Sequence, residues 1–223
     1  MKTLLLATTA LVAFAAGAQA ADLGSRRAPV AAAVVAPAFS WTGFYVGAFA
    51  GYGWNNFNAF GPGAGTGNGP LLGATIGYNY QINQFVLGAE ADLAFAAITG
   101  RATAAPTFSL RTNMLGSVRA RAGFAVDRAL LYVTGGLGIQ NAAWSQNAAP
   151  IERFTRTGWT LGGGVEYAIT QNWTAKLEYN YYNFGTRPAG PVYFMPIRNE
   201  VHTVKLGVNY LFSTGPSAVV ARY

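Results

Sequence analysis

The stretch TVKLGVNYLF at residues 203–212 decides the fold, because its apolar and polar side chains alternate. Valine, leucine and aromatic residues occupy the even positions, while Thr203, Lys205, Gly207 and Asn209 occupy odd ones. Successive side chains of a β-strand point to opposite faces, so a period of two predicts a strand with one apolar face and one polar face.

Segments upstream show the same period of two. In each of them, large apolar residues share one face, and glycine, threonine, asparagine or charged residues share the other. We expect strands over residues 42–54, 72–80, 85–93, 118–124, 130–140, 159–167, 175–181 and 203–212. The connections alternate in length: they are tight near 82–84, 126–129 and 170–172, and long near 55–70, 95–110, 141–156 and 184–200.

The composition indicates a membrane protein that has no transmembrane helix. Hydrophobic residues make up 52% of the chain and charged residues only 10%, whereas a soluble domain has about 25% charged residues. Beyond the N-terminus there is no run of roughly 18 apolar residues, the length that a transmembrane helix needs. The hydrophobicity is instead distributed residue by residue, as in a membrane β-barrel, where lipid-facing and lumen-facing side chains alternate.

The alternating lengths of the connections between the expected strands also indicate a membrane β-barrel. Alternation of short and long connections is typical of the periplasmic turns and extracellular loops of outer-membrane barrels. An even strand count allows closure, which removes strand edges that lipid could not satisfy. Aromatic residues near both ends of the expected strands match the two bilayer interfaces. We therefore predict an all-β fold: an eight-stranded antiparallel up-and-down transmembrane β-barrel with short periplasmic turns and four longer extracellular loops.

The N-terminal residues predict export. Lys2, the apolar stretch after it and the small-x-small sequence at 18–20 are typical of a cleavable signal peptide. We expect the mature protein to reside in the cell outer membrane. The predicted organisation is a signal peptide at 1–20, an Ala/Pro-rich periplasmic linker at 21–40, the barrel at 41–212 and a C-terminal tail at 213–223.

Four segments of the expected barrel are similar to a known family. They are WTGFYVG at 41–47, GAEAD at 88–92, VRARAG at 118–123 and GVEY at 164–167. The chain resembles the small porin-like outer-membrane proteins of alphaproteobacteria and, more distantly, the membrane domain of the OmpA and opacity-protein superfamily. The resemblance covers the whole barrel and implies its fold. Family members are described as porins, envelope-stabilising proteins, adhesins or haem-binding antigens, so the fold does not imply a single function.

The last expected strand resembles the assembly signal of outer-membrane barrels. Lys205, Gly207, Tyr210 and Phe212 match its polar–x–Gly–x–x–aromatic–x–aromatic pattern. The resemblance implies that the barrel-insertion machinery is a partner during assembly. Family members usually stop at the terminal phenylalanine, whereas this chain continues through 213–223. The role of that tail stays open.

Charged residues fall on the inward faces of the expected strands, four acids and four bases. An eight-stranded barrel has room inside for side chains and little else, and a buried charge without a partner costs several kcal/mol. The balance of charge predicts an ion-pair network that plugs the lumen; small inward residues leave a narrow, gated pore as the alternative. The predicted network comprises Glu90, Asp92, Arg119, Arg121, Glu166, Lys176, Glu178 and Lys205.

The expected outer loops and rim carry more arginines than acids. Arginine binds phosphate oxygens bidentately, so membrane lipid and lipopolysaccharide are predicted partners, with ordinary solvated loop charge as the alternative interpretation. The candidate contacts are Arg101, Arg111, Arg153, Arg156, Arg187 and Arg198.

Few residues in the sequence have the types and spacing that an enzyme or a cofactor-binding protein needs. His202 is the sole histidine, and no serine follows it at the spacing expected of a lipid A-modifying hydrolase on such a barrel. The glycine-rich residues 61–69 lack the spacing of a phosphate loop. Cysteine is absent, which excludes thiolate metal sites and disulfides, and the scattered arginines oppose nucleic-acid binding despite a net charge of +7. We expect no catalytic, cofactor or metal site and no nucleic-acid partner.

The predicted function is therefore that of a surface barrel without enzymatic activity, which stabilises the envelope or interacts with other molecules through its loops. A narrow porin for small solutes is the alternative, and a lipid A-modifying hydrolase is a remote one. The sequence identifies neither a host or envelope ligand for the loops nor the oligomeric state.

Overall fold

The computed structural model describes residues 39–57, 65–102, 108–146, 149–189 and 193–213. The predicted signal peptide and nearly all of the predicted linker and tail lie outside these ranges. Of the two units into which the chain divides, Pro37–Tyr223 contains the barrel. Within the described ranges, no helix is long and apolar enough to cross a membrane.

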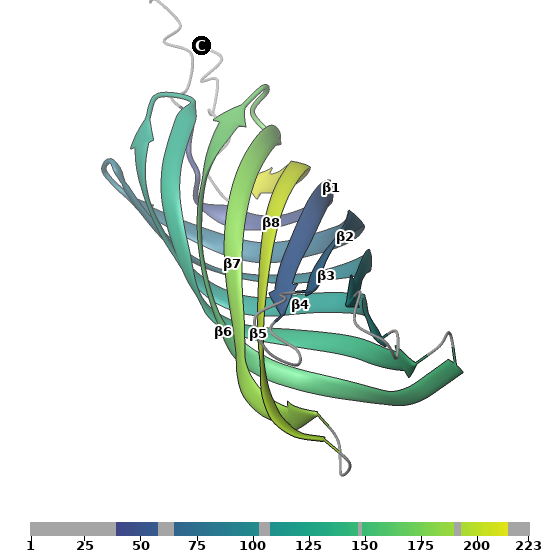
Figure 1. The fold of residues 1–223 in the computed structure, drawn as a ribbon. Helices are drawn as coiled ribbons and strands as arrows, with labels where there is room; N and C mark the ends of the chain where they lie inside the picture. The colour runs from purple at the N-terminus through teal and green to yellow at the C-terminus, as the bar shows by residue number, and fades with distance from the viewer. Residues whose placement is uncertain (1–38, 58–64, 103–107, 147–148, 190–192, 214–223) are drawn as a thin grey trace, which may run out of the picture. The chain divides into compact units, whose positions relative to one another are not determined.

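Eight strands form a closed barrel in which each strand is hydrogen-bonded to its neighbours in the sequence, and the first is hydrogen-bonded to the last (Figure 1). All the pairings are antiparallel; Val46, for example, lies opposite Ile76 on one side and Tyr210 on the other. The predicted fold class is thereby confirmed. The strands are β1 (Gly43–Phe57), β2 (Gly65–Ile82), β3 (Phe85–Ala102), β4 (Phe108–Val126), β5 (Ala129–Gln146), β6 (Ala149–Ala168), β7 (Trp173–Ala189) and β8 (Tyr193–Ser213).

The alternation of side chains in the sequence becomes the two faces of the barrel wall. On β8, Val204, Leu206 and Val208 are exposed on the outside, whereas Thr203 and Lys205 are buried inside. The same parity holds along the membrane-spanning part of the other strands, so the wall presents large apolar side chains outward. A soluble protein has the opposite arrangement, with apolar side chains inside, whereas an apolar outer wall suits a lipid environment.

Two of the three turns at the periplasmic end contain a residue with a positive φ. Asn83 has φ 55° between β2 and β3, and Asp127 has φ 50° between β4 and β5. Asparagine and aspartate tolerate this left-handed conformation better than other non-glycine residues. Both turns can therefore be very short, which holds the neighbouring strands in register at this end.

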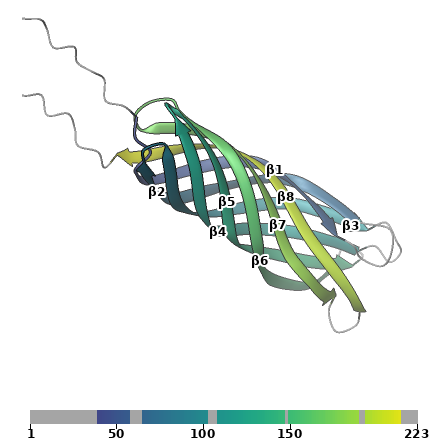
Figure 2. The same cartoon turned by 90° about the vertical axis from the view of Figure 1, so that its left-hand side faces the viewer.

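The strands extend further at the outer end than the sequence predicts. A transmembrane β-strand needs about 9–11 residues, yet these strands contain between 15 and 21. Much of the predicted loops at 55–70, 95–110, 141–156 and 184–200 is therefore hydrogen-bonded strand, which continues past the membrane-spanning part of the barrel (Figure 2). The apolar alternation fades there because no lipid faces the wall, whereas backbone pairing requires no apolar side chain.

The ladder between β6 and β7 ends before these strands do. It begins at the pair Trp159 and Asn183 and runs to the periplasmic end. Beyond that row, a bulge between Asn183 and Thr186 interrupts β7, and Gly185 adopts φ 68°. The outer ends of the β5–β6 and β7–β8 hairpins consequently point in different directions (Figure 1).

Candidate functional site

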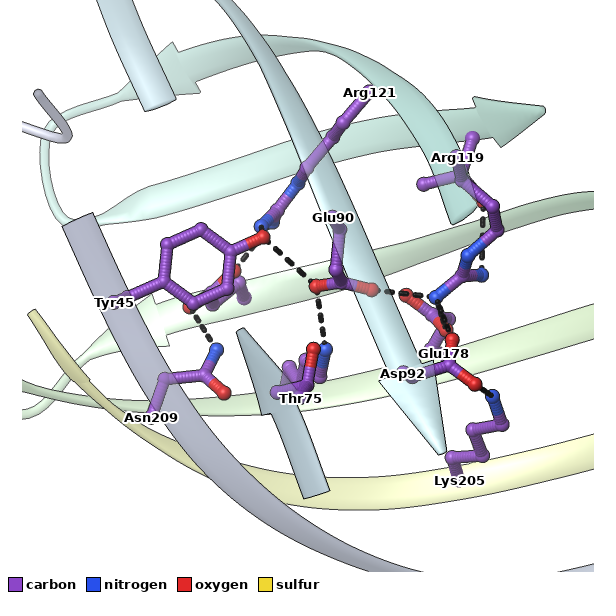
Figure 3. Close-up of polar contacts among 12 residues, drawn as sticks. Tyr45, Thr75, Glu90, Asp92, Arg119, Arg121, Glu178, Lys205 and Asn209 are labelled. Atoms are coloured by element: carbon purple, nitrogen blue, oxygen red, sulfur yellow. Dashed lines mark hydrogen bonds and ion pairs between the residues drawn. The ribbon is translucent and has the colours of Figure 1, made fainter. Parts of the chain in front are cut away.

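The lumen of the barrel contains the densest cluster of charged side chains in the described part of the chain. All eight residues of the predicted network point inward, and none is more than 7% exposed. They come from five strands, and the close-up in Figure 3 shows several of them meeting across the lumen. They are Glu90 and Asp92 of β3, Arg119 and Arg121 of β4, Glu166 of β6, Lys176 and Glu178 of β7, and Lys205 of β8.

Arg119 lies at the centre of this network. Its Nη2 atom is 2.8 Å from Asp92 Oδ2 and 2.9 Å from Glu178 Oε1, and it also contacts Glu90. Its Nη1 atom donates hydrogen bonds to Asn180 and Thr134. One guanidinium group thus joins β3, β4, β5 and β7 across the lumen (Figure 3).

A second centre, nearer the periplasm, surrounds Arg121. Its guanidinium group pairs with Glu166 and lies 3.7 Å from the centre of the Tyr132 ring, in cation–π contact. Glu166 also accepts hydrogen bonds from Thr174 and from Asn209. The carboxylate of Glu166 is therefore satisfied on both oxygens.

The two lysines of the network pair with two acids that Arg119 also contacts. Lys176 Nζ is 2.8 Å from Glu90 Oε2, and Lys205 Nζ is 3.3 Å from Asp92 Oδ1. Tyr45 donates a hydrogen bond of 2.8 Å to Glu90. All eight predicted residues thus take part in ion pairs with other members of the network, and their formal charges cancel.

Two apolar layers, which the sequence analysis did not identify, enclose the charged layer. Along β3, the inward side chains change from Val86 at the periplasmic end, through Glu90 and Asp92, to Ile98 towards the outside. The periplasmic layer contains Trp41, Val86, Ala125, Leu130, Tyr132 and Ala168. The outer layer contains Phe49, Leu71, Ala94, Ala96, Ile98, Leu115, Tyr182, Phe184 and Val201.

The segment that precedes β1 contributes to the periplasmic layer. Trp41 is only 1% exposed and packs edge-to-face against Phe39. Its backbone N–H donates to Gln81 Oε1 at 2.8 Å, and Gln81 N–H in turn donates to Thr42 Oγ1 at 2.9 Å. These reciprocal hydrogen bonds hold the tryptophan in the periplasmic end of the lumen.

A chain of hydrogen bonds crosses the lumen towards its outer end. Asn199 Nδ2 of β8 donates to Gln140 Oε1 of β5 at 2.6 Å, and Gln140 Nε2 donates to Thr112 Oγ1 of β4 at 2.7 Å. All three residues are buried. The interior therefore has four successive layers, which are apolar, charged, apolar and polar from the periplasmic to the outer end.

The six arginines predicted to contact lipopolysaccharide do not share one environment. Arg111 and Arg153 are exposed, and the side chains of Arg101, Arg187 and Arg198 lie outside the described residues. Arg156 is 5% exposed, lies against the Phe154 ring and faces the lumen, so its assignment to the outer surface is wrong. The sequence around Arg156 lacks the apolar alternation that reveals which side chains face inward.

The residues of the predicted assembly signal lie on both faces of β8. Lys205 belongs to the lumen network, whereas Tyr210 and Phe212 form an aromatic group at the periplasmic end with ring centroids 5.0 Å apart. The Trp173 ring of β7 extends this group, 5.1 Å from Tyr210. The aromatic part of the motif thus coincides with a belt at the membrane interface.

His202 lies on the outer wall and not in the lumen. Its ring stacks on Trp54 with centroids 5.6 Å apart, and its Nδ1 is 2.7 Å from the Tyr179 hydroxyl oxygen. These partners are aromatic, and within the described ranges no three His, Cys, Asp or Glu residues are arranged to hold a metal ion. The environment of His202 suits an interfacial aromatic belt.

A closed barrel with an apolar outer wall and buried charged and apolar side chains inside defines a small outer-membrane β-barrel. Residues 6–212 match the family of the outer membrane protein beta-barrel domain, and the chain belongs to this family. Its relatives are outer-membrane proteins of alphaproteobacteria, and this protein is accordingly one of the outer membrane.

Three of these relatives are similar along much of their length. The chain is 37% identical to the 31 kDa outer-membrane immunogenic protein of Brucella melitensis biotype 1, over 95% of this chain and 100% of the relative. It is 32% identical to the 25 kDa outer-membrane immunogenic protein of Brucella abortus biovar 1, over 95% and 99%. It is 36% identical to the 22 kDa outer membrane protein of Rhizobium leguminosarum bv. viciae, over 70% of each chain.

Proposed function

We propose that this protein is a closed, non-conducting barrel that stabilises the outer membrane and presents its outer rim for interaction. The observation that carries the proposal is the order of layers in the lumen. The ion pairs lie between an apolar layer that includes Trp41 and one that includes Phe49 and Tyr182. A solute would have to pass both apolar layers and break the network between them.

The energetics of the charged layer favour a structural role over a conducting one. A selective pore would benefit from an excess of one charge, but the eight charges of the network cancel. Arg119 alone holds three carboxylates, and separating a buried ion pair leaves charges uncompensated at a cost of several kcal/mol. The network therefore resists the rearrangement that a pore would need.

In this function, the outer rim is the part of the barrel that contacts other molecules. The strands continue as paired hairpins past the aromatic belt of Trp54 and Trp159, into the aqueous phase. Two relatives are named outer-membrane immunogenic proteins, and such a name fits a protein that is accessible at the cell surface.

The permeability of proteoliposomes tests this proposal. Vesicles that contain the refolded protein are expected to swell in small sugars and amino acids at the rate of protein-free vesicles, because the lumen has no continuous aqueous path. A general porin serves as the positive control, and circular dichroism verifies that the barrel is folded. Swelling above the protein-free rate would favour the narrow porin instead.

We also propose that Arg111 and Arg153 contact lipopolysaccharide phosphates. Both are exposed and lie in one row across β4, β5 and β6, with only Ala143 between them. The strand spacing places their Cα atoms about 10 Å apart. Two guanidinium groups at this distance can contact separate phosphates of one headgroup.

Charge reversal tests this contact. The variant with Arg111→Glu and Arg153→Glu is expected to bind lipopolysaccharide vesicles about three- to tenfold more weakly, since two exposed ion pairs become repulsive. Arg128→Glu, at an exposed periplasmic turn, is the matched control. Unchanged binding of the double variant in a co-sedimentation assay would contradict the proposed contact.

A further inference from the structure

The outer part of β6 has β5 as its neighbour, but β7 lies opposite β6 only from Trp159 towards the periplasm. Among the described residues, the register with β7 contains no pair for Arg153, Thr155 or Thr157. β7 has a bulge between Asn183 and Thr186 here, and the outer parts of β6 and β7 diverge (Figure 1). The barrel wall, which is closed within the membrane, thus has a strand edge at its rim.

The two edges that separate here differ in their capacity to bind another strand. An exposed edge presents backbone N–H and C=O groups to a further strand, and natural proteins block this pairing with proline, charge or a bulge. β7 has both a bulge and Pro188 near its outer end. Residues 151–158 of β6 contain no proline, and their charged residues are Glu152, Arg153 and Arg156. The register of β6 with β5 is continuous from Glu152 to the periplasmic end, so this edge lacks a bulge.

The side chains along this part of β6 indicate the chemistry of a partner. Arg153, Thr155 and Thr157 are exposed and share the outward face. An additional strand would place its alternate side chains directly opposite these three residues, where opposite charges and pairs of threonines are favourable. Its matching features are an acidic residue opposite Arg153 and threonine or serine opposite the two threonines.

A second copy of this protein in the same membrane does not fit the edge. Two copies with the same orientation are related by a two-fold axis along the membrane normal, which inclines their facing β6 strands in opposite senses. Strands of such barrels tilt by about 35–45°, so the two would cross at about 70–90° and could not form a ladder. A partner strand at this edge would therefore come from a flexible, extended segment of another polypeptide.

We propose that the outer edge of β6, around Arg153, Thr155 and Thr157, binds an extended segment of an extracellular polypeptide as an additional antiparallel strand, with an acidic side chain opposite Arg153. This inference rests on the proposed role in surface interaction and names its site and the class of partner. Backbone hydrogen bonds supply the affinity in this binding mode, and the alternate side chains supply the specificity.

A synthetic peptide tests the proposed edge. The probe alternates threonine with valine, carries one glutamate and is added to the refolded, isotope-labelled protein in phosphatidylcholine nanodiscs without lipopolysaccharide. We expect chemical-shift changes of the backbone amides that are confined to the outer parts of β5, β6 and β7. Changes spread over the lipid-facing wall, or no change at all, would overturn the proposal.

Two N-methylated forms of the peptide separate strand pairing from adhesion. Each form is methylated at alternate residues, so that one loses the N–H donors of one edge and the other loses those of the opposite edge. Only one edge of an added strand forms hydrogen bonds with β6. We therefore expect the form that keeps the N–H donors of that edge to bind, and the other form not to bind. Binding by both forms would rule out an added strand.

The charge of Arg153 supplies the matched protein variants. Arg153→Glu is expected to weaken binding of the glutamate peptide about three- to tenfold and to favour a lysine version of it. Arg128→Glu, at the exposed periplasmic turn between β4 and β5, should leave the affinity unchanged. Equal effects of the two variants would overturn the assignment of the site to β6. If peptide binding fails while the barrel stays impermeable, this inference fails and the proposed closed barrel stands.

Discussion

The variant Arg119→Met is expected to lower the free energy of unfolding by about 3–5 kcal/mol, the cost of removing one partner from a buried ion-pair network. Arg119 contacts Glu90, Asp92 and Glu178, and its removal leaves these carboxylates buried with less positive charge around them. Methionine keeps much of the volume of the side chain. The loss therefore reports the charge and its hydrogen bonds more than a cavity.

Urea-induced unfolding in lipid vesicles, followed by tryptophan fluorescence, measures this loss. Arg128→Met is the matched control because Arg128 is exposed at a periplasmic turn, where a substitution should change stability by less than about 0.5 kcal/mol. The double variant Arg119→Met/Glu178→Gln should lose less than the sum of its single variants, since the two residues are in direct contact. Equal stability of the Arg119 and Arg128 variants would contradict the structural role of the network.

The variant Leu177→Arg is expected to destabilise the folded barrel in lipid by about 2–4 kcal/mol, the cost of a cation at the bilayer midplane on a lipid-facing wall. Leu177 points outward on β7, midway between Trp173 of the periplasmic belt and Tyr181, whose ring packs against the belt residue Trp159. In the protein alone, 49% of the surface of Leu177 is exposed. In the membrane that surface contacts hydrocarbon, so a guanidinium group there has no water or acidic partner.

Two comparisons isolate the effect of lipid on this variant. Leu177→Ala removes the same apolar contacts without adding charge, so it should cost less than Leu177→Arg. Gln84→Arg places the cation at an exposed periplasmic turn and should be nearly neutral. Refolding yields and urea midpoints in vesicles rank the stabilities of the three variants. A Leu177→Arg barrel as stable as the Gln84→Arg barrel would show that this face does not meet the membrane.

The membrane-spanning wall could be predicted from the sequence because lipid imposes a strict period of two. Val204 and Leu206 on β8, or Val118 and Ala120 on β4, reveal which side chains point outward, and the inward position of Lys205 and Arg119 follows. The ion-pair partners could not be predicted in the same way. Arg119 meets Glu178 across the lumen, from strands that are not neighbours, so their contact depends on the stagger of the closed sheet.

The apolar layers and the outer rim escaped the sequence analysis for different reasons. Phe49, Tyr182 and Phe184 occupy inward positions, and an aromatic residue among glycines and polar residues gives no periodic signal of its own. The parity of these residues with Gly47 or Asn180 could have identified them as luminal. At the rim, the alternation ends with the lipid, so neither the length of β6 nor the inward direction of Arg156 was visible.

Single-channel recording in planar bilayers tests the closed lumen most directly. We predict that the refolded protein, shown independently to be folded, produces no conductance steps, because the two apolar layers enclose the neutral ion-pair network. Reproducible steps whose size changes when Arg119 or Glu166 is neutralised would contradict this account, because such steps would place an ion path through the network itself.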